Sequence, residues 1–172
     1  MSGADYNSVV HRAQVPVAVW PETVGANDRL MAENEVVIDA DRERVFAVLA
    51  DGPRYHQWVM GAADVRAADD AWPAPGSRIH HSTGVGKLTI DDSTEVVACD
   101  PPKRLELLAH LGPLGSFRVE FTLDALAGGR TSVRMVEAPV EGVSKLAGPV
   151  GDAVGKLRNM LSLARLKEIA ER

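Results

Sequence analysis

Cysteine is nearly absent from this sequence. Cys99 is the only cysteine among 172 residues, so no internal disulfide can form and no zinc site can be built from several thiolates. Long apolar runs are missing as well, and none approaches the roughly 18 residues that a membrane-spanning helix requires. We therefore expect no stable insertion into a membrane.

Positive charge is also in short supply. The chain carries 19 Lys and Arg against 24 Asp and Glu, a net charge of -5, whereas nucleic acids and acidic membranes favour basic surfaces. The first 20 residues lack the basic region and the apolar region of a secretory signal. We therefore predict a cytoplasmic, reducing location and no nucleic-acid partner.

Several signatures of catalysis and of cofactor binding are absent. The sequence has no GxGxxG, no P-loop and no Gly-x-Ser-x-Gly elbow. His80 and His81 are adjacent, so on a strand they point to opposite faces and cannot share a metal ion. No HxH or HxxxH pair occurs elsewhere. The sequence therefore predicts no metal and no cofactor.

What is present is typical of one globular domain behind an extension. The chain is 45% hydrophobic and 25% charged. We interpret residues 1–32 as an N-terminal extension that is partly flexible, because Pro16 and Pro21 break any helix and terminal segments fray unless they dock. The alternating valines of 15–19 leave a second interpretation open, in which Val17–Trp20 packs on a neighbouring surface.

The folded part, residues 33–172, begins with a strand and a capped helix. Glu35–Ile38 is a short strand, and Asp39 or Asp41 can cap the helix that follows. Asp51-Gly52-Pro53 stops this helix, since Gly accepts a left-handed conformation and Pro cannot continue it. A second short helix is expected at Arg54–Trp58. The apolar stripe of the first helix consists of Val45, Phe46, Val48 and Leu49.

A succession of strands separated by turns follows. Alternation is clearest where Phe117, Val119, Phe121 and Leu123 face one side, and a strand with one wet face belongs to an antiparallel sheet. The predicted strands are Ala63–Ala67, Arg78–Thr83, Lys87–Cys99 with a bend near Asp91, Arg104–His110, Ser116–Ala125 and Thr131–Ala138.

After Pro139 the apolar period becomes helical. The spacing predicts a long helix over Glu141–Ala170, kinked or interrupted by Pro149. Its glycines lower helix propensity, so they indicate either close contact with the sheet or room for a ligand. The apolar side of this helix is predicted to consist of Val143, Leu146, Val150, Val154, Leu157, Leu161, Ala164, Leu166 and Ile169.

This pattern resembles the SRPBCC superfamily, also called START-like, and within it the polyketide cyclase/dehydrase and lipid-transport group. The resemblance covers 33–172 and is carried by VVIDADRERVFAVLADGPRYHQW, PPKRLEL, GGRTSVRM and the closing amphipathic helix. It implies an α+β helix-grip fold, in which a curved antiparallel sheet of six or seven strands wraps a long C-terminal helix, with two short helices after the first strand. The chain departs from the family pattern at Val59–Gly61, where relatives often carry Pro.

The resemblance also implies an apolar cavity between the sheet and the long helix. Such cavities hold lipids, polyketides or other hydrophobic molecules, and in some relatives they catalyse aldol-type cyclisation and dehydration. From strand parity and the expected cavity entrance, the predicted ligand-binding residues are Tyr55, Trp58, Ile79, Leu107, Phe117, Phe121, Met135 and Leu157.

Two residues are candidates for acid–base catalysis. Glu137 shares the apolar face of its strand, where a carboxylate could serve as a general acid or base, although at the strand end it could equally lie in water. His81 shares a face with Ile79 and Thr83, and an imidazole suits proton transfer, but a wet or structurally bonded histidine is the alternative. Trp58 is either a lid over the cavity or part of the core.

Three functions follow, with binding of a hydrophobic or amphipathic small molecule in first place. The alternatives are a polyketide aromatase/cyclase-like enzyme that uses a cavity acid or base, and a protein-interaction module resembling the co-chaperone branch of the superfamily. An enzyme would show a buried ionisable pair facing a cavity of roughly 300 Å³ or more. An interaction module would show a filled cavity and an exposed apolar patch. The sequence leaves a homodimer open.

Overall fold

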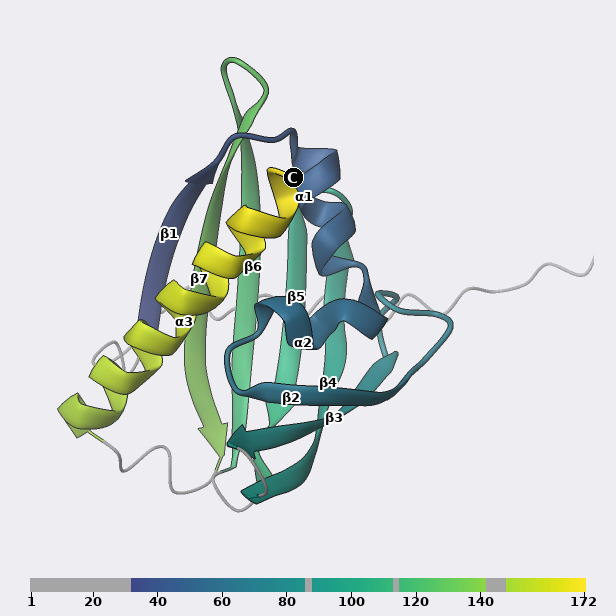
Figure 1. Ribbon diagram of the computed structural model, residues 1–172, viewed down its shortest axis with the longest axis vertical. Helices are drawn as coiled ribbons and strands as arrows, with labels where there is room; N and C mark the ends of the chain where they lie inside the picture. Colours follow the sequence, from purple (N-terminus) through teal and green to yellow (C-terminus); the bar gives the residue numbers. More distant parts are fainter. Residues whose placement is uncertain (1–31, 86–87, 113–114, 142–147) are drawn as a thin grey trace, which may run out of the picture.

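The computed structural model describes residues 32–85, 88–112, 115–141 and 148–172. In these residues seven antiparallel strands form one curved sheet in the order β1-β7-β6-β5-β4-β3-β2 (Figure 1). The predicted α+β helix-grip fold is confirmed. The extension predicted at 1–32 lies outside the described residues except for Ala32, which begins β1. The strands are β1 (Ala32–Ile38), β2 (Ala62–Ala68), β3 (Arg78–Val85), β4 (Leu88–Asp100), β5 (Arg104–His110), β6 (Ser116–Leu126) and β7 (Arg130–Glu141).

Helix α1 (Arg42–Leu49) begins where the sequence places a capping aspartate. Asp41 has extended backbone angles and its carboxylate accepts a 2.8 Å hydrogen bond from the N–H of Arg44. This bond satisfies one of the backbone donors that a helix N-terminus leaves free. Between the two candidates, Asp41 is therefore the cap. Helix α1 directs Val45, Phe46 and Leu49 into the core.

Helix α1 ends at Leu49, just before Asp51-Gly52-Pro53, with Ala50 as a right-handed C-cap. The left-handed conformation expected of Gly52 is wrong, because Gly52 begins a second turn instead. A single 3-10 turn, η2 (Gly52–Arg54), is capped by the Asp51 side chain, and α2 (Tyr55–Trp58) follows directly. Gly52 is buried against the indole of Trp72. A Cβ at this position would lie 3.1 Å from that ring, tighter than most side-chain contacts, so the absence of a side chain suits the site. These short helices place Tyr55 and Trp58 over the concave face of the sheet.

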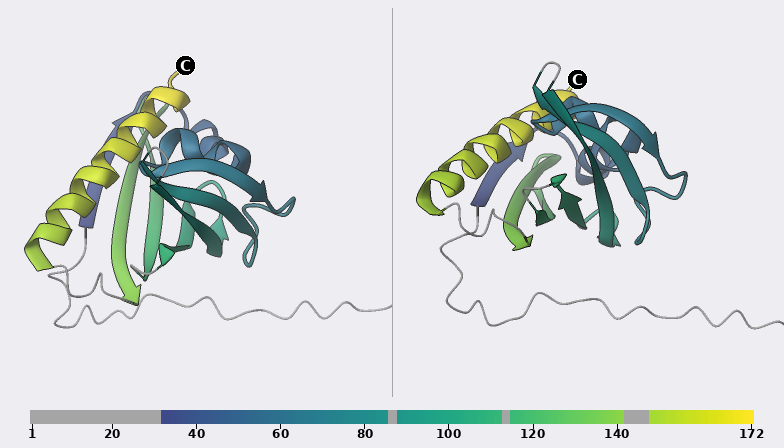
Figure 2. Two further views of the ribbon diagram at one scale, coloured as in Figure 1. Left: turned by 60° about the horizontal axis from the view of Figure 1, so that its bottom comes forward. Right: turned by 90° about the horizontal axis from the view of Figure 1, so that it is seen from below.

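The sheet buries one face of each central strand. Phe121 and Leu123 of β6 and Val133 of β7 are at most 1% exposed, and Leu123 pairs with Val133 in the antiparallel register. The core residues come from this face, α1, α2 and the C-terminal half of the long helix α3 (Gly148–Ala170). Figure 2 shows these helices on the concave side of the sheet. Among the described residues, no helix combines the length and the hydropathy that crossing a bilayer requires.

The long helix differs from the prediction at its start. Glu141 is the last residue of β7, residues 142–147 lie outside the described part, and α3 begins at Gly148. Pro149 therefore occupies the first turn, where its missing N–H leaves no hydrogen bond unmade. The expected kink at this proline is wrong for that reason. The predicted positions Val143 and Leu146 cannot be placed.

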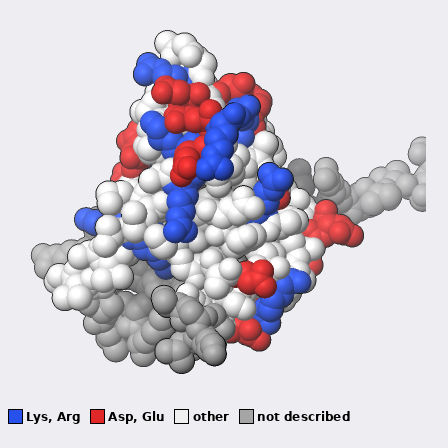
Figure 3. Space-filling view, viewed as in Figure 1, with Lys and Arg blue, Asp and Glu red and all other residues white. Residues whose placement is uncertain are grey.

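The first half of α3 also faces differently from the prediction. Helix α3 packs chiefly against β1, and a Cβ at Gly155 would lie 3.7 Å from that of Ala32, an ordinary contact distance. The predicted apolar side faces outward here, and the surface over this half carries few charges, whereas charges gather over the C-terminal half (Figure 3). The exposed apolar side chains are Val150 (75%), Val154 (63%), Leu157 (54%), Met160 (51%) and Leu161 (37%).

Candidate functional site

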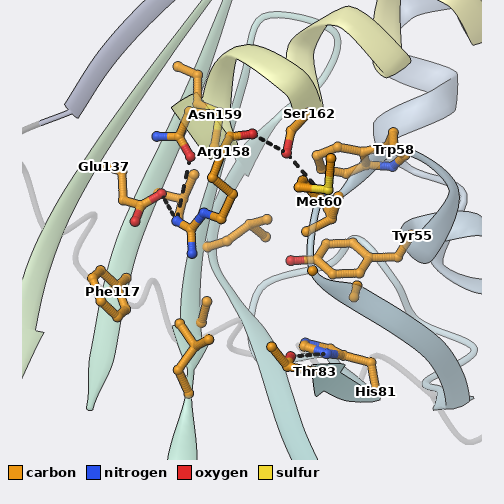
Figure 4. A pocket seen from close by; sticks show the side chains of 18 of the residues that line it. Tyr55, Trp58, Met60, His81, Thr83, Phe117, Glu137, Arg158, Asn159 and Ser162 are labelled. Carbon is orange, nitrogen blue, oxygen red and sulfur yellow. Dashed lines mark hydrogen bonds and ion pairs between the residues drawn. The ribbon is translucent and has the colours of Figure 1, made fainter. Parts of the chain in front are cut away.

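A cavity of about 110 Å³ lies between the concave sheet face, α2 with the loop after it, and α3 (Figure 4). It is partly open to solvent. The residues that line it come from α2, the loop 59–61, the first residue of β2, strands β3, β5, β6 and β7, Leu111 after β5, and one stretch of α3. The lining residues are Tyr55, Trp58, Val59, Met60, Gly61, Ala62, His81, Thr83, Leu107, Ala109, His110, Leu111, Phe117, Val119, Phe121, Met135, Glu137, Arg158, Asn159 and Ser162.

Apolar side chains from neighbouring strands form the floor of the cavity. Strand pairing sets them side by side, since Leu107 of β5 lies opposite Val119 of β6, and Phe121 of β6 lies opposite Met135 of β7. Trp58 closes the top, with its ring edge-to-face against Phe121 at 5.6 Å between centroids. The floor is therefore built from residues two apart on each strand, the period that alternation along a strand dictates.

A buried ion pair forms one polar wall. Arg158 of α3 reaches down to the sheet, and its Nη2 donates to the carboxylate of Glu137, which is only 4% exposed. Its Cζ lies 5.8 Å from the ring centroid of Phe117, within cation–π range. The Asn159 Oδ1 is 3.5 Å from the same Nη2. The guanidinium therefore balances the negative charge of Glu137, which would otherwise be buried among apolar side chains without a partner.

A chain of hydrogen bonds forms the opposite wall. The Tyr55 hydroxyl lies 3.2 Å from Oγ1 of Thr94, which in turn lies 3.0 Å from Nε2 of His81. The other ring nitrogen of His81 is 3.3 Å from Oγ1 of Thr83. In Figure 4 the Tyr55 hydroxyl points across the cavity toward the guanidinium of Arg158. Both polar walls therefore face the same space.

Burial shifts the pKa values of two residues in this wall. Desolvation lowers the pKa of His81, and the negative charge of nearby Asp92 offsets part of that effect. Desolvation likewise raises the pKa of Tyr55, against smaller effects from Thr94 and Arg158. At neutral pH the wall therefore consists of an uncharged imidazole and uncharged hydroxyls.

One hydrogen bond ties the loop above the cavity to α3. The Met60 N–H donates to Oγ of Ser162 at 2.9 Å, and that hydroxyl donates to the carbonyl of Arg158 at 3.0 Å. Gly61 follows with a φ of 101°, a conformation that favours glycine. The loop 59–61 is thus positioned by the same helix that carries Arg158.

No three His, Cys, Asp or Glu side chains in the described ranges gather closely enough to hold a metal ion. The chemistry of the cavity rests on one ion pair, one chain of hydroxyl and imidazole groups, and an apolar floor.

The family model described as "Polyketide cyclase / dehydrase and lipid transport" matches residues 29–171. The protein belongs to this polyketide cyclase/dehydrase and lipid transport family. The resemblance seen in the sequence is thereby confirmed. No curated protein matches the sequence.

Solved structures similar to this family member share its fold at low identity. Hypothetical protein jhp0584 from Helicobacter pylori is 16% identical with a TM-score of 0.69, over 89% of this chain and 95% of that one. The Zhui aromatase/cyclase from Streptomyces sp. R1128 is 17% identical with a TM-score of 0.67, over 83% and 93%. Protein CV1439 from Chromobacterium violaceum is 18% identical with a TM-score of 0.66, over 83% and 99%.

The structure brings most of the predicted site residues of this family member to one cavity. Two exceptions exist: Ile79 is fully buried in the core behind the lining, and Leu157 is 54% exposed on the outer side of α3. These two side chains do not line the cavity. The ligand contacts predicted for all of these residues stay predictions. Those that line the cavity are Tyr55, Trp58, His81, Leu107, Phe117, Phe121, Met135 and Glu137.

Sequence reasoning missed the polar contribution of α3. Arg158, Asn159 and Ser162 line the cavity, whereas an apolar helix side including Leu157 was expected there. Asn159 is 0% exposed and Ser162 is 2% exposed. The position of Ser162, four residues after Arg158 and three after Asn159, was a usable signal, because residues at i+3 and i+4 share a helix face.

Proposed function

We propose that this protein binds a hydrophobic or amphipathic small molecule in the cavity, with a polar group of that molecule held between Arg158 and Tyr55. The observation that carries the proposal is the arrangement in Figure 4, where a guanidinium and a hydroxyl face each other above an apolar floor. Ligand sites are typically apolar with a few convergent polar groups. Apolar burial supplies the affinity, at about 25 cal/mol per Å², and the polar pair orients the ligand.

An enzyme of the aromatase/cyclase kind is the second candidate. It is favoured by the ionisable residues at the cavity, and the Zhui aromatase/cyclase shares the fold. The cavity volume, about 110 Å³, lies below the roughly 300 Å³ of typical ligand sites and bears equally on binding and on catalysis. One observation weighs against the enzyme alone. Glu137 is occupied by Arg158, and both ring nitrogens of His81 have hydroxyl partners. Binding is therefore the better supported function.

A protein-interaction module is supported by one of its two expected features. Apolar side chains on the first half of α3 are exposed, but the cavity is not filled as that alternative requires. A cytoplasmic location and a homodimer stay predictions.

Uptake of a neutral dye tests the binding function. We expect N-phenyl-1-naphthylamine, whose single phenyl ring can enter the partly open cavity, to bind the purified protein with a rise in fluorescence, and Ala109→Phe, which fills the cavity, to abolish that rise. The matched control is Ala138→Phe, because Ala138 pairs with Arg118 on the opposite sheet face. Native mass spectrometry after mild extraction adds a second measurement. Equal dye uptake by both variants, with no co-purifying molecule, would contradict the proposal.

A further inference from the structure

The charges around the cavity cancel among themselves. Arg158 is paired with Glu137, and burial keeps His81 uncharged at neutral pH. Beyond the lining, Asp92 is 5% exposed and lies opposite His81 in the β3–β4 register. Neither carboxylate oxygen of Asp92 has a hydrogen-bond partner in the described structure. Arg66, the other cation that acts on His81, is paired with Asp91. The charge is therefore balanced at the cavity wall, and behind it the two carboxylates of Asp91 and Asp92 outnumber the one guanidinium of Arg66.

A second anion entering this space would lack a compensating cation. Arg158 already has a carboxylate partner, Glu137, whose side chain is only 5% exposed. A ligand carboxylate would compete with Glu137 for the same guanidinium while repelling both Glu137 and Asp92. Burying an uncompensated charge is far more costly than burying a dipole. The Coulomb term thus disfavours a fatty acid or any other free carboxylate.

An uncharged ligand oxygen does not carry this electrostatic cost. Arginine carries five N–H donors, and in the described structure the Arg158 side chain donates hydrogen bonds through Nη2 alone. Figure 4 shows another guanidinium nitrogen directed toward the cavity, across from the Tyr55 hydroxyl. A carbonyl oxygen between them can accept from both without bringing charge, and hydrogen bonds from a charged donor are the stronger ones.

We infer that the cavity selects uncharged molecules bearing a carbonyl-type oxygen, such as ketones, esters or amides, over carboxylates of the same shape. This inference rests on the proposed function, because it presumes that the cavity takes a ligand. It goes further in assigning the charge of that ligand and the atom by which it is held.

Three single-ring probes of nearly the same shape separate these effects. Acetophenone presents a neutral carbonyl, benzoate a carboxylate and isopropylbenzene no acceptor. Single-ring probes are chosen because the cavity, at about 110 Å³, is somewhat smaller than one of about 150 Å³ that holds benzene. Binding is followed by NMR titration at pH 8, where histidine is ordinarily neutral. We expect acetophenone to bind about tenfold more tightly than isopropylbenzene, and benzoate to bind most weakly.

Two variants assign the selectivity to the ion pair. Glu137→Gln keeps the shape but frees the positive charge of Arg158, so benzoate should gain about tenfold while acetophenone changes little. Arg158→Met keeps an unbranched apolar stem but removes the donor, so the preference for acetophenone over isopropylbenzene should disappear. The affinity for isopropylbenzene reports whether each variant still has its cavity.

The outcomes separate the two proposals. If none of the probes binds the wild-type protein, the proposed function fails and the charge selectivity falls with it. If isopropylbenzene binds but benzoate binds as tightly as acetophenone, the cavity takes ligands and the inference is overturned. It is equally overturned if acetophenone gains nothing over isopropylbenzene, or if Glu137→Gln leaves benzoate affinity unchanged.

Discussion

The guanidinium of Arg158 in α3 donates a hydrogen bond to the carboxylate of Glu137 in β7, and that carboxylate is almost completely buried. The pair connects the long helix to the sheet at the edge of the cavity. It therefore contributes to two properties at once, the position of α3 over the sheet and the charge of the cavity wall. Each property can be measured separately.

Arg158→Met should destabilise the protein more than Glu137→Gln does. Removing the cation leaves a buried carboxylate uncompensated, which costs about 3 kcal/mol or more for a fully buried pair. The Arg158 side chain is 31% exposed, so we expect about 1–2 kcal/mol after solvent screening. Urea unfolding of both variants and of the double mutant gives the coupling energy. A coupling energy of zero would mean that the pair does not hold α3 to the sheet.

His81 should make stability depend on pH below neutrality. Burial lowers its pKa in the folded protein, so the unfolded chain takes up the proton first. Stability is therefore complete above the unfolded pKa of about 6.5 and decreases as the pH falls from there toward the folded pKa, by at most about 1.4 kcal/mol per pH unit. The measurement is urea unfolding between pH 8 and pH 5.

The matched comparison is His81→Gln against His80→Gln. The two histidines are neighbours on β3, but His81 is 4% exposed whereas His80 is exposed on the other face. We expect the decrease in stability below pH 6.5 to shrink in His81→Gln and to persist in His80→Gln. The same decrease in both variants would rule out His81 as its source.

Asp41→Ala should cost about 1 kcal/mol of stability, the usual effect of losing a helix N-cap. The Asp41 carboxylate accepts a hydrogen bond from the N–H of Arg44, whereas Asp39 donates one to Glu171 through its backbone N–H. Asp39→Ala is therefore the control, with an expected change below about 0.5 kcal/mol. Thermal unfolding followed by circular dichroism measures both. Equal losses would contradict the assignment of Asp41 as the cap.

Ser162→Ala should loosen the loop above the cavity. The variant removes the acceptor of the Met60 N–H, a loss of about 1 kcal/mol that corresponds to roughly fivefold faster amide exchange. Hydrogen exchange at Met60 measures the effect. The control is Ser77→Ala, whose hydroxyl is also buried but donates to Ala74 far from this loop. If Met60 exchanges at the wild-type rate, the loop is held by other contacts.

The sheet could be predicted because the sequence patterns that specify it are local. Alternation in β6 sets Phe121 and Leu123 on one face, and both are buried as expected. Asp41 and Asp51-Gly52-Pro53 likewise specify where α1 begins and ends through bonds within a few residues. Strand parity also placed Glu137 on the inner face. Capping, turn chemistry and period therefore recovered the frame of the fold and part of the cavity lining.

The ion pair and the orientation of α3 were not predictable in this way. Glu137 and Arg158 are separated by the segment 142–147 and meet only through tertiary packing. Both sides of α3 carry apolar residues, with Val154 and Leu157 on one side and Leu163 on another. The period of the sequence is compatible with either side facing inward. The choice depends on how the helix packs against β1, which no local pattern encodes.

Substitutions at two leucines of α3 test this orientation directly. Leu163 is 2% exposed in the core, whereas Leu157, six residues earlier, is 54% exposed and faces away from the cavity. Leu163→Ala removes packed atoms and should cost about 2–5 kcal/mol. Leu157→Ala should change stability by less than about 0.5 kcal/mol, because it creates no buried cavity. Urea unfolding measures both, and dye uptake by Leu157→Ala should match the wild type. A large loss of stability or of dye binding in Leu157→Ala would show that this side of the helix faces inward, as the sequence period had predicted.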